Sequence, residues 1–383
     1  MTGYADRKRM GASEVRCYGL LGSAIAVECD IVGTHAWLAE FLTPAFEIRP
    51  AAEADLYVAI LADNRAYERA AATRPKAPLD DVNCFALDSS IKARRAWSVA
   101  GETIVEDDKH GVLWRLVGKR VEVLIGRARE RCRIETMRVI REIATACVLA
   151  SADRLQLHAA ALESGGRALL VAGPKGAGKT TLLCYLAMST RAGMIANDRV
   201  IVSRDAGFDV RGVPTIVSVR PGTSRLLPCS FDTVPRVARP VQLTLAEADA
   251  ARRNVGSVDA GDHLYLSPAQ FARALGISLS PSGRLAAIAF PQSHTEAGGL
   301  AVDRLKPDAA EQWLRAARFG LGSGKNAATV FERLVDGRRS AGADESLVAA
   351  LAGTVPCVVV RIGAHLFSRP DAARAVLAAC LGA

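Results

Sequence analysis

Residues Leu169–Thr181, with the sequence LLVAGPKGAGKTT, combine an apolar run with glycines, lysines and threonines. Eight of them match the pattern G-x-x-x-x-G-K-[ST] at every defined position: Gly173, Pro174, Lys175, Gly176, Ala177, Gly178, Lys179 and Thr180. Glycines let backbone N–H groups approach phosphate oxygens with no Cβ in the way. The motif needs a strand before it and a helix after it, and the runs RALLVA and TTLLCYLAM predict both. The pattern predicts a site for a nucleoside triphosphate, ATP.

The last residues of this motif have distinct expected roles. Lys179 is expected to reach the β- and γ-phosphates, and the Thr180 hydroxyl to ligate Mg²⁺. Thr181 follows in the first turn of the expected helix, whose N-terminus carries a partial positive charge. The alternative is a glycine-rich turn that binds nothing.

Polar residues interrupt the apolar runs on both sides of the motif. His158 lies in LQLHAAAL, and Asn197, Asp198 and Arg199 lie in MIANDRVIV. A carboxylate such as Asp198 can ligate Mg²⁺ or accept the proton of an attacking hydroxyl, and a histidine can orient that carboxylate. His158 is alternatively a satisfied core histidine, and Asn197 either supports the site or is a turn residue. We find no NKxD-type guanine signature and no LSGGQ-like transporter signature.

The order LHAAAL, GPKGAGKTT, MIANDRVIV resembles the catalytic core of HPr serine kinase and its relatives over about residues 150–225. These relatives include the kinases of lasso-peptide clusters, which phosphorylate peptide serines. In that family a His-Gly or His-Ala strand precedes the phosphate loop, and an Asp-Asp-Arg-Val strand follows it. The resemblance implies an α/β fold with a P-loop nucleotide-binding domain of the HPr kinase and phosphoenolpyruvate carboxykinase type. It also implies that His158 and Asp198 are catalytic, with Lys179.

The implied activity is an ATP- and Mg²⁺-dependent kinase that transfers phosphate to a hydroxyl, most plausibly a serine of a small protein or peptide. Asn197 stands where the family has the first aspartate of its pair, and the family's downstream glycine- and arginine-containing signature is not found. Both departures weaken the expectation of HPr as acceptor. Two alternatives stay open: a nucleotide-switched binding protein that phosphorylates nothing, and a small-molecule kinase.

Three segments follow from these expectations. Residues 1–130 are expected to form a smaller, strand-rich α+β domain that recognises the acceptor or mediates assembly into a homo-oligomer. Residues 131–150 are expected to form a connecting helix, and residues 151–383 the phosphate-loop domain. In the first segment, two alternating runs in Gly111–Gly126 flank Gly118 and Lys119, which predicts a hairpin.

The helical segment Ile134–Ala150 places apolar residues on one face: Ile134, Met137, Ile140, Ile143, Ala144, Cys147 and Val148. Arginines accompany it: Arg127, Arg129, Arg131, Arg133, Arg138 and Arg141. They predict the solvated face of an amphipathic helix, or alternatively an anion-binding patch.

Signals weaken beyond Arg211. GVPTIVSV, LAAIAF and TVPCVVVRI predict strands, and LSPAQFARALG, DAAEQWLRAARFG and DAARAVLAACLG predict helices. Arg220 is a candidate for stabilising charge on the transferred group. A surface arginine is the simpler interpretation of this residue.

Composition excludes several classes of protein. The net charge of +9 is too small to indicate nucleic-acid binding, and no apolar run is long enough to span a membrane. The nine cysteines are scattered and never spaced as CxxC, which favours a reduced compartment without structural zinc. No secretion signal is recognised, so we expect a cytoplasmic enzyme.

Overall fold

The computed structural model describes residues 14–29, 31–82, 94–107, 111–126, 132–174, 176–205, 207–219, 264–293, 301–318, 329–335, 341–363 and 370–381. They fall into two compact units. The first comprises the described residues of Met1–Leu42, Phe46–Ala150 and Gly322–Arg338, and the second those of Thr43–Ala45, Ser151–Leu321 and Arg339–Ala383. Within these described ranges, no helix has the length and apolar character needed to cross a membrane.

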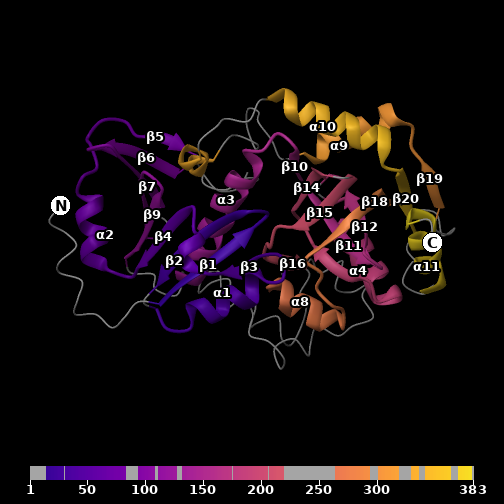
Figure 1. The fold of residues 1–383 in the computed structure, drawn as a ribbon, viewed down its shortest axis with the longest axis horizontal. Helices are drawn as coiled ribbons and strands as arrows, with labels where there is room; N and C mark the ends of the chain where they lie inside the picture. Colours follow the sequence, from indigo (N-terminus) through magenta and orange to yellow (C-terminus); the bar gives the residue numbers. More distant parts are fainter. Residues whose placement is uncertain are drawn as a thin grey trace. The chain divides into compact units, whose positions relative to one another are not determined.

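The first unit contains a mixed sheet with the order β3-β1-β2-β4-β9-β8-β7-β6-β5 among its described strands (Figure 1). Their bounds are β1 (Glu14–Leu20), β2 (Ser23–Cys29), β3 (Glu47–Arg49), β4 (Leu56–Leu61), β5 (Asp80–Val82), β6 (Arg94–Val99), β7 (Glu102–Asp107), β8 (Val112–Val117) and β9 (Arg120–Ile125). The pairs β2–β4 and β4–β9 are parallel, and the others are antiparallel. The predicted hairpin is confirmed as β8 and β9, with Gly118 at φ 54° in its turn.

Helices cover this sheet. α1 (Thr34–Leu42) and α3 (Cys132–Leu149) pack against each other, and α3 also contacts β1, β2, β4 and β9. α2 (Asn64–Ala71) packs on β8 and β9, and the Asp63 carboxylate caps its N-terminus by accepting from two backbone amides. Two short 3₁₀ segments complete the unit: η2 (Ala51–Glu53) and η6 (Val330–Leu334), the latter packed on α3.

The helix predicted over Ile134–Ala150 is confirmed as α3, which belongs to the first unit. The prediction of a solvated arginine face holds for Arg133, which is exposed. It is wrong for Arg141, which is 6% exposed and forms a 2.8 Å ion pair with the buried Glu142. Arg138 is half-buried and pairs with Glu135. These charged side chains of α3 therefore pair with one another within the protein. Arg127, Arg129 and Arg131 lie outside the described residues.

The second unit also contains a mixed sheet, with the path β10-β14-β15-β18-β12-β11-β13 and with β20 and β19 beyond β18. Its strands are β10 (Arg154–Leu157), β11 (Ala159–Ser164), β12 (Arg167–Ala172), β13 (Gly193–Ala196), β14 (Val200–Asp205), β15 (Gly207–Gly212), β18 (Ser282–Ser293), β19 (Ala301–Arg304) and β20 (Cys357–Ile362). β12, β18 and β20 are parallel neighbours. A separate pair is formed by β16 (Val217–Val219) and β17 (Leu264–Leu266). Together, the two sheets confirm the α/β class.

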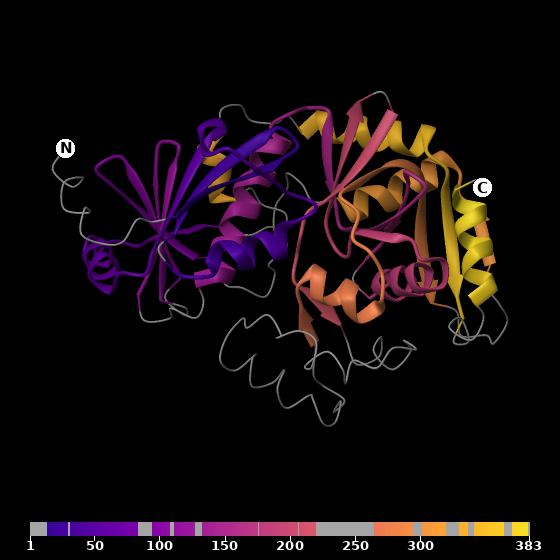
Figure 2. The ribbon, with the colours of Figure 1, turned by 60° about the horizontal axis from the view of Figure 1, so that its bottom comes forward.

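Both faces of the second sheet are buried. Leu169 and Val171 of β12 join a core with α4 (Lys179–Thr190), α8 (Pro268–Leu275) and α11 (Pro370–Leu381). Leu170 and Ala172 point the other way, into a core with α9 (Pro307–Ala317) and α10 (Ala341–Thr354). Figure 2 shows the α9 and α10 pair and α4 on different sides of the strands. This alternation along one strand explains why its sequence is a continuous apolar run.

Two strands that the sequence predicts as continuous are each divided in the structure. LHAAAL is interrupted at His158, between β10 and β11, and MIANDRVIV at Asn197–Arg199, between β13 and β14. The predicted strand GVPTIVSV is shortened to β16. LAAIAF and TVPCVVVRI are confirmed within β18 and β20, and the three predicted helices as α8, α9 and α11.

Candidate active site

The glycine-rich loop joins β12 to α4. Gly173, Gly176 and Gly178 have φ angles of 146°, 91° and 95°, which L side chains rarely adopt. A Cβ on Gly176 would meet no atom within 4 Å, so the loop surface is open at that point. Gly178 is the N-cap of α4 and offers no side-chain cap. The first backbone amides of α4 therefore have no capping side chain at this position.

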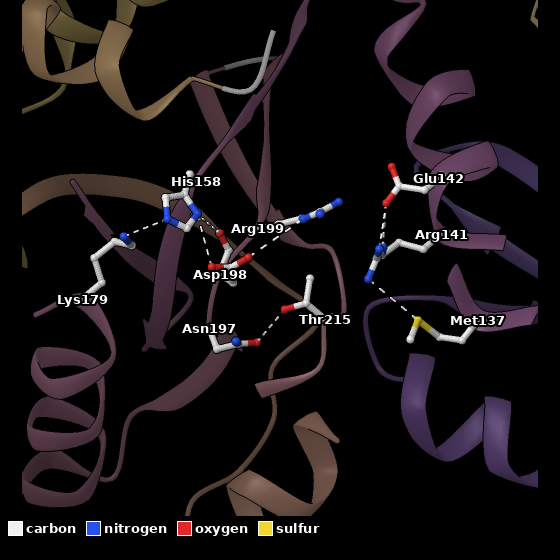
Figure 3. Close-up of polar contacts among 9 residues, drawn as sticks. All are labelled: Met137, Arg141, Glu142, His158, Lys179, Asn197, Asp198, Arg199 and Thr215. Carbon is white, nitrogen blue, oxygen red and sulfur yellow. Dashed lines mark hydrogen bonds and ion pairs between the residues drawn. The ribbon is translucent and has the colours of Figure 1, made fainter. Parts of the chain in front are cut away.

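Lys179 is the first residue of α4, and its side chain turns back over the loop. It is 7% exposed. Its ammonium donates to the carbonyl oxygens of Gly173 and Pro174, at 2.9 and 3.1 Å. The third partner is Nε2 of His158, at 3.0 Å (Figure 3). The charge of Lys179 is thus held beside the loop backbone.

His158 faces Asn197–Arg199 because the two interrupted strands are antiparallel partners. Leu157 pairs with Val200, and Ala161 pairs with Ala196. Between these two residue pairs, the two segments stop pairing with each other at the same level of the sheet. The backbone N–H of His158, which has lost its ladder partner, donates instead to the carbonyl of Ala317 at the end of α9, at 2.7 Å. This hydrogen bond holds the backbone of His158 in place, and with it the start of the side chain.

Asp198 meets the second nitrogen of His158. Nδ1 lies 3.2 Å from the Asp198 carboxylate Oδ1 and 3.2 Å from its backbone carbonyl. Since the Lys179 ammonium can only donate, Nε2 accepts, and Nδ1 carries the proton that is donated to Asp198. The neutral imidazole thus links Lys179 to Asp198 in one chain of contacts (Figure 3).

Burial and two neighbouring charges shift the pKa of His158. Burial lowers its pKa from 6.5, the neighbouring Lys179 lowers it further, and the Asp198 carboxylate raises it. The net direction is downward, because the imidazolium would be desolvated and would repel Lys179. His158 is therefore neutral near pH 7, in agreement with the tautomer that its contacts require.

Asp198 also lies near a second cation. Its Oδ2 is 4.0 Å from Nε of Arg199, whose side chain is 9% exposed, whereas the Asp198 side chain is 37% exposed. The Asp198 carboxylate therefore lies near His158 and Arg199 and is also accessible to solvent. Thr180 and Thr181 are half-buried in the first turn of α4.

Asn197 points away from Asp198. It is 8% exposed, and its Oδ1 accepts a hydrogen bond from the Thr215 hydroxyl at 3.2 Å (Figure 3). Asn197 lies in the bend between β13 and β14, and its side chain is engaged by Thr215. Sequence reasoning missed Thr215 and assigned no role to Arg199. The adjacency of Arg199 to Asp198 was a usable signal, but nothing in the sequence pairs Thr215 with Asn197.

Most of the expected site residues converge. The described loop residues, Lys179, His158 and Asp198 are joined through the contacts above, with Thr180 and Thr181 in the adjoining turn of α4. Lys175 and Arg220 lie outside the described residues.

Comparisons with known proteins add no family to this geometry. No protein-family model matches the chain, and a search of curated proteins finds no match. The chemistry of the site is therefore inferred from the loop, Lys179, His158 and Asp198 themselves.

Proposed function

We propose that the chain is an ATP- and Mg²⁺-dependent kinase that transfers the γ-phosphoryl group to a hydroxyl, in the first place a serine of a small protein or peptide. In this proposal the second unit is a P-loop nucleotide-binding domain related to that of HPr kinase, and the first unit recognises the acceptor or mediates assembly. The protein acts in the cytoplasm. The observation that carries the proposal is the chain of contacts from the glycine loop through Lys179 and His158 to Asp198.

The loop suits a triphosphate. Its positive-φ glycines, the open space above Gly176 and the uncapped start of α4 provide backbone donors and a helix N-terminus for phosphate oxygens. Lys179 already holds a buried ammonium at this position. It would exchange a loop carbonyl for a phosphate oxygen, which is the better acceptor because it is charged.

The donors near the loop also suit Mg²⁺. The ion prefers oxygen ligands, binds through one or two protein groups plus substrate phosphates and waters, and keeps near-octahedral geometry. Thr180 offers a hydroxyl and Asp198 a solvent-reachable carboxylate. A bound Mg²⁺ supplies neutralisation of phosphate charge at this site. Among the described residues, no group of three or more His, Cys, Asp and Glu forms a metal cluster, so phosphate oxygens and water would complete the shell.

Asp198 is the group that would receive the acceptor proton. The acceptor oxygen forms a bond to the γ-phosphorus as the bond from that phosphorus to the β,γ-bridging oxygen breaks, and the hydroxyl proton passes to the Asp198 carboxylate. His158 keeps that carboxylate oriented through its Nδ1–H. Because Nε2 accepts from Lys179, the neutral imidazole stands between the lysine charge and this carboxylate and contacts both.

A second candidate is a nucleotide-switched binding protein. Asn197 supports it, because a neutral amide stands next to Asp198 where a second carboxylate would strengthen the metal and base region. A third candidate, a kinase for small-molecule hydroxyls, would use the same loop and the same carboxylate.

Incubation of the full chain with Mg²⁺ and ATP labelled at the γ-phosphate, in a lysate of cells lacking the protein, separates these candidates. The proposal expects label in a protein or peptide, stable to hydroxylamine as a phosphoserine is. Label in a small molecule would favour the metabolite kinase. Release of phosphate alone, or no turnover with ATP bound, would favour the switch.

A further inference from the structure

The stretch Gly212–Thr215, which begins at the last residue of β15, lies directly against the turn between β13 and β14. A Cβ on Gly212 would collide with the carbonyl oxygen of Ile195 in β13. The next residue, Val213, donates its backbone N–H to the carbonyl of Arg199 at 2.9 Å. Close backbone approach at Gly212 thus lets the following residues bond to the turn that carries Asp198.

Two hydrogen bonds hold the residues on either side of Asp198. The bond from Val213 fixes Arg199, and the bond from the Thr215 hydroxyl fixes the side chain of Asn197. Both Asn197 and Thr215 are less than a tenth exposed, at 8% and 6%. A buried hydroxyl-to-amide hydrogen bond is costly to break on one side only, since the remaining group stays unsatisfied.

We propose that Asn197 and Thr215 form a positioning pair that orients Asp198 toward His158. The catalytic meaning of this pair rests on the proposed function. The hydrogen bond between Thr215 and Asn197 does not depend on that function. Asn197 acts through Thr215 and not on the metal, because its side-chain oxygen is engaged by the Thr215 hydroxyl. Thr215 is accordingly a positioning residue and not a catalytic one.

The cost of burying a charge explains why an amide side chain suits position 197. A second carboxylate there would place a buried negative charge beside Asp198, which is costly without a paired cation. An asparagine oxygen accepts the same hydrogen bond without that charge. The residue that departs from a two-carboxylate site is therefore one whose side chain is buried here without a charge.

Thr215→Val tests the pair, with Thr215→Ser as the matched control that keeps the hydroxyl. Asn197→Ala removes the acceptor from the other side, and the double variant closes a cycle. The direct readout is the Nδ1–H signal of His158 in the nitrogen-15 NMR spectrum of the nucleotide-free full chain, assigned with His158→Gln. Nδ1 lies 3.2 Å from both the backbone carbonyl and the carboxylate Oδ1 of Asp198, so the signal of its proton reports how Asp198 is placed.

We expect Thr215→Val and Asn197→Ala to shift or broaden this signal alike, the double variant to add nothing further, and Thr215→Ser to resemble the unchanged chain. In the lysate assay, misplacement of Asp198 should slow label transfer by about tenfold to a hundredfold while Mg·ATP affinity stays within about twofold. Reduced stability with an unchanged Nδ1–H signal would overturn the positioning role. If the unchanged chain transfers no label, the proposed function fails, and the NMR result still decides the inference.

Discussion

The hairpin of β8 and β9 in the first unit and the two interrupted strands of the second unit begin from similar sequences. Both consist of short apolar runs around a few polar residues. In the hairpin the ladder is unbroken from Val112 paired with Ile125 to Val117 paired with Arg120. In the second unit the ladder stops at the same level in both paired segments, at His158 in one and at Asn197–Arg199 in the other.

The polar residues are used differently in the two regions. In the hairpin, Arg115 and Arg120 both pair with Glu122 on one face of the sheet, and their side chains are about one-third exposed. In the interrupted strands the backbone turns, so Asp198 and His158 leave the ladder and contact each other, and His158 also contacts Lys179. The polar side chains of the intact hairpin pair with one another across the strands, whereas His158 and Asp198 at the paired interruption contact groups outside the ladder.

The largest effect should follow loss of the charge at Asp198. Asp198→Asn keeps the shape and the contact with His158 but removes the proton acceptor. We expect label transfer to fall by about 10²- to 10⁴-fold, with Mg·ATP binding reduced much less because Lys179 and the loop remain. Asp205→Asn, on the exposed end of β14, is the matched control and should change neither. Transfer at the unchanged rate by Asp198→Asn would contradict the mechanism.

Protonation of His158 should have a smaller effect, on stability. Its pKa is lowered in the folded chain, first by burial, so the unfolded chain binds the proton at a higher pH. The contribution of His158 to the free energy of unfolding is therefore complete above its ordinary pKa of 6.5 and is lost as the pH falls below that value.

Denaturant unfolding between about pH 7.5 and about pH 5.5 measures this dependence. The unchanged chain should lose more stability over this range than His158→Gln, which has no proton to bind. Equal pH dependence in the unchanged chain and His158→Gln would show that the pKa of His158 is not lowered by folding.

The smallest effect is expected in the hairpin. Arg115→Gln removes the ion pairs with Glu122 and Glu102. Arg115 is about one-third exposed, so solvent weakens these pairs, and the buried Glu122 keeps its ion pair with Arg120. We expect a loss of no more than about 1 kcal/mol of unfolding free energy, measured by denaturant titration, and unchanged label transfer. A larger loss of unfolding free energy, or slower label transfer, would show that the charged residues of the hairpin do more than stabilise neighbouring strands.

The sequence predicted what depends on local pattern. The glycine loop, the strand before it and α4 after it follow from residues that are adjacent in the chain, as do the hairpin at Gly118 and the helix α3. The buried state of Arg141 was not predictable, because an arginine on a helix is ordinarily solvated and its pairing with Glu142 depends on what packs around the helix.

The interruptions and the pair Asn197 and Thr215 depend on tertiary contacts. Polar residues interrupt the apolar runs at His158 and at Asn197–Arg199, but single strands also contain such residues, so nothing local shows that the ladder stops there. The breaks coincide only because the two segments are partners in the sheet. The helix α10 was also missed, since its alanine-rich sequence has no marked apolar face.

The central claim is that the loop and the interrupted strands form one nucleotide site in which Lys179 holds the phosphate charge. Calorimetric titration of the full chain with Mg·ATP, compared with Lys179→Ala, tests it most directly. The account predicts saturable binding by the unchanged chain and binding weakened by about tenfold to a hundredfold in Lys179→Ala, as for loss of a charged hydrogen bond. Lys119→Ala, in the hairpin turn, should bind as the unchanged chain does. Equal Mg·ATP binding by the unchanged chain and Lys179→Ala, or no binding by either, would contradict the account.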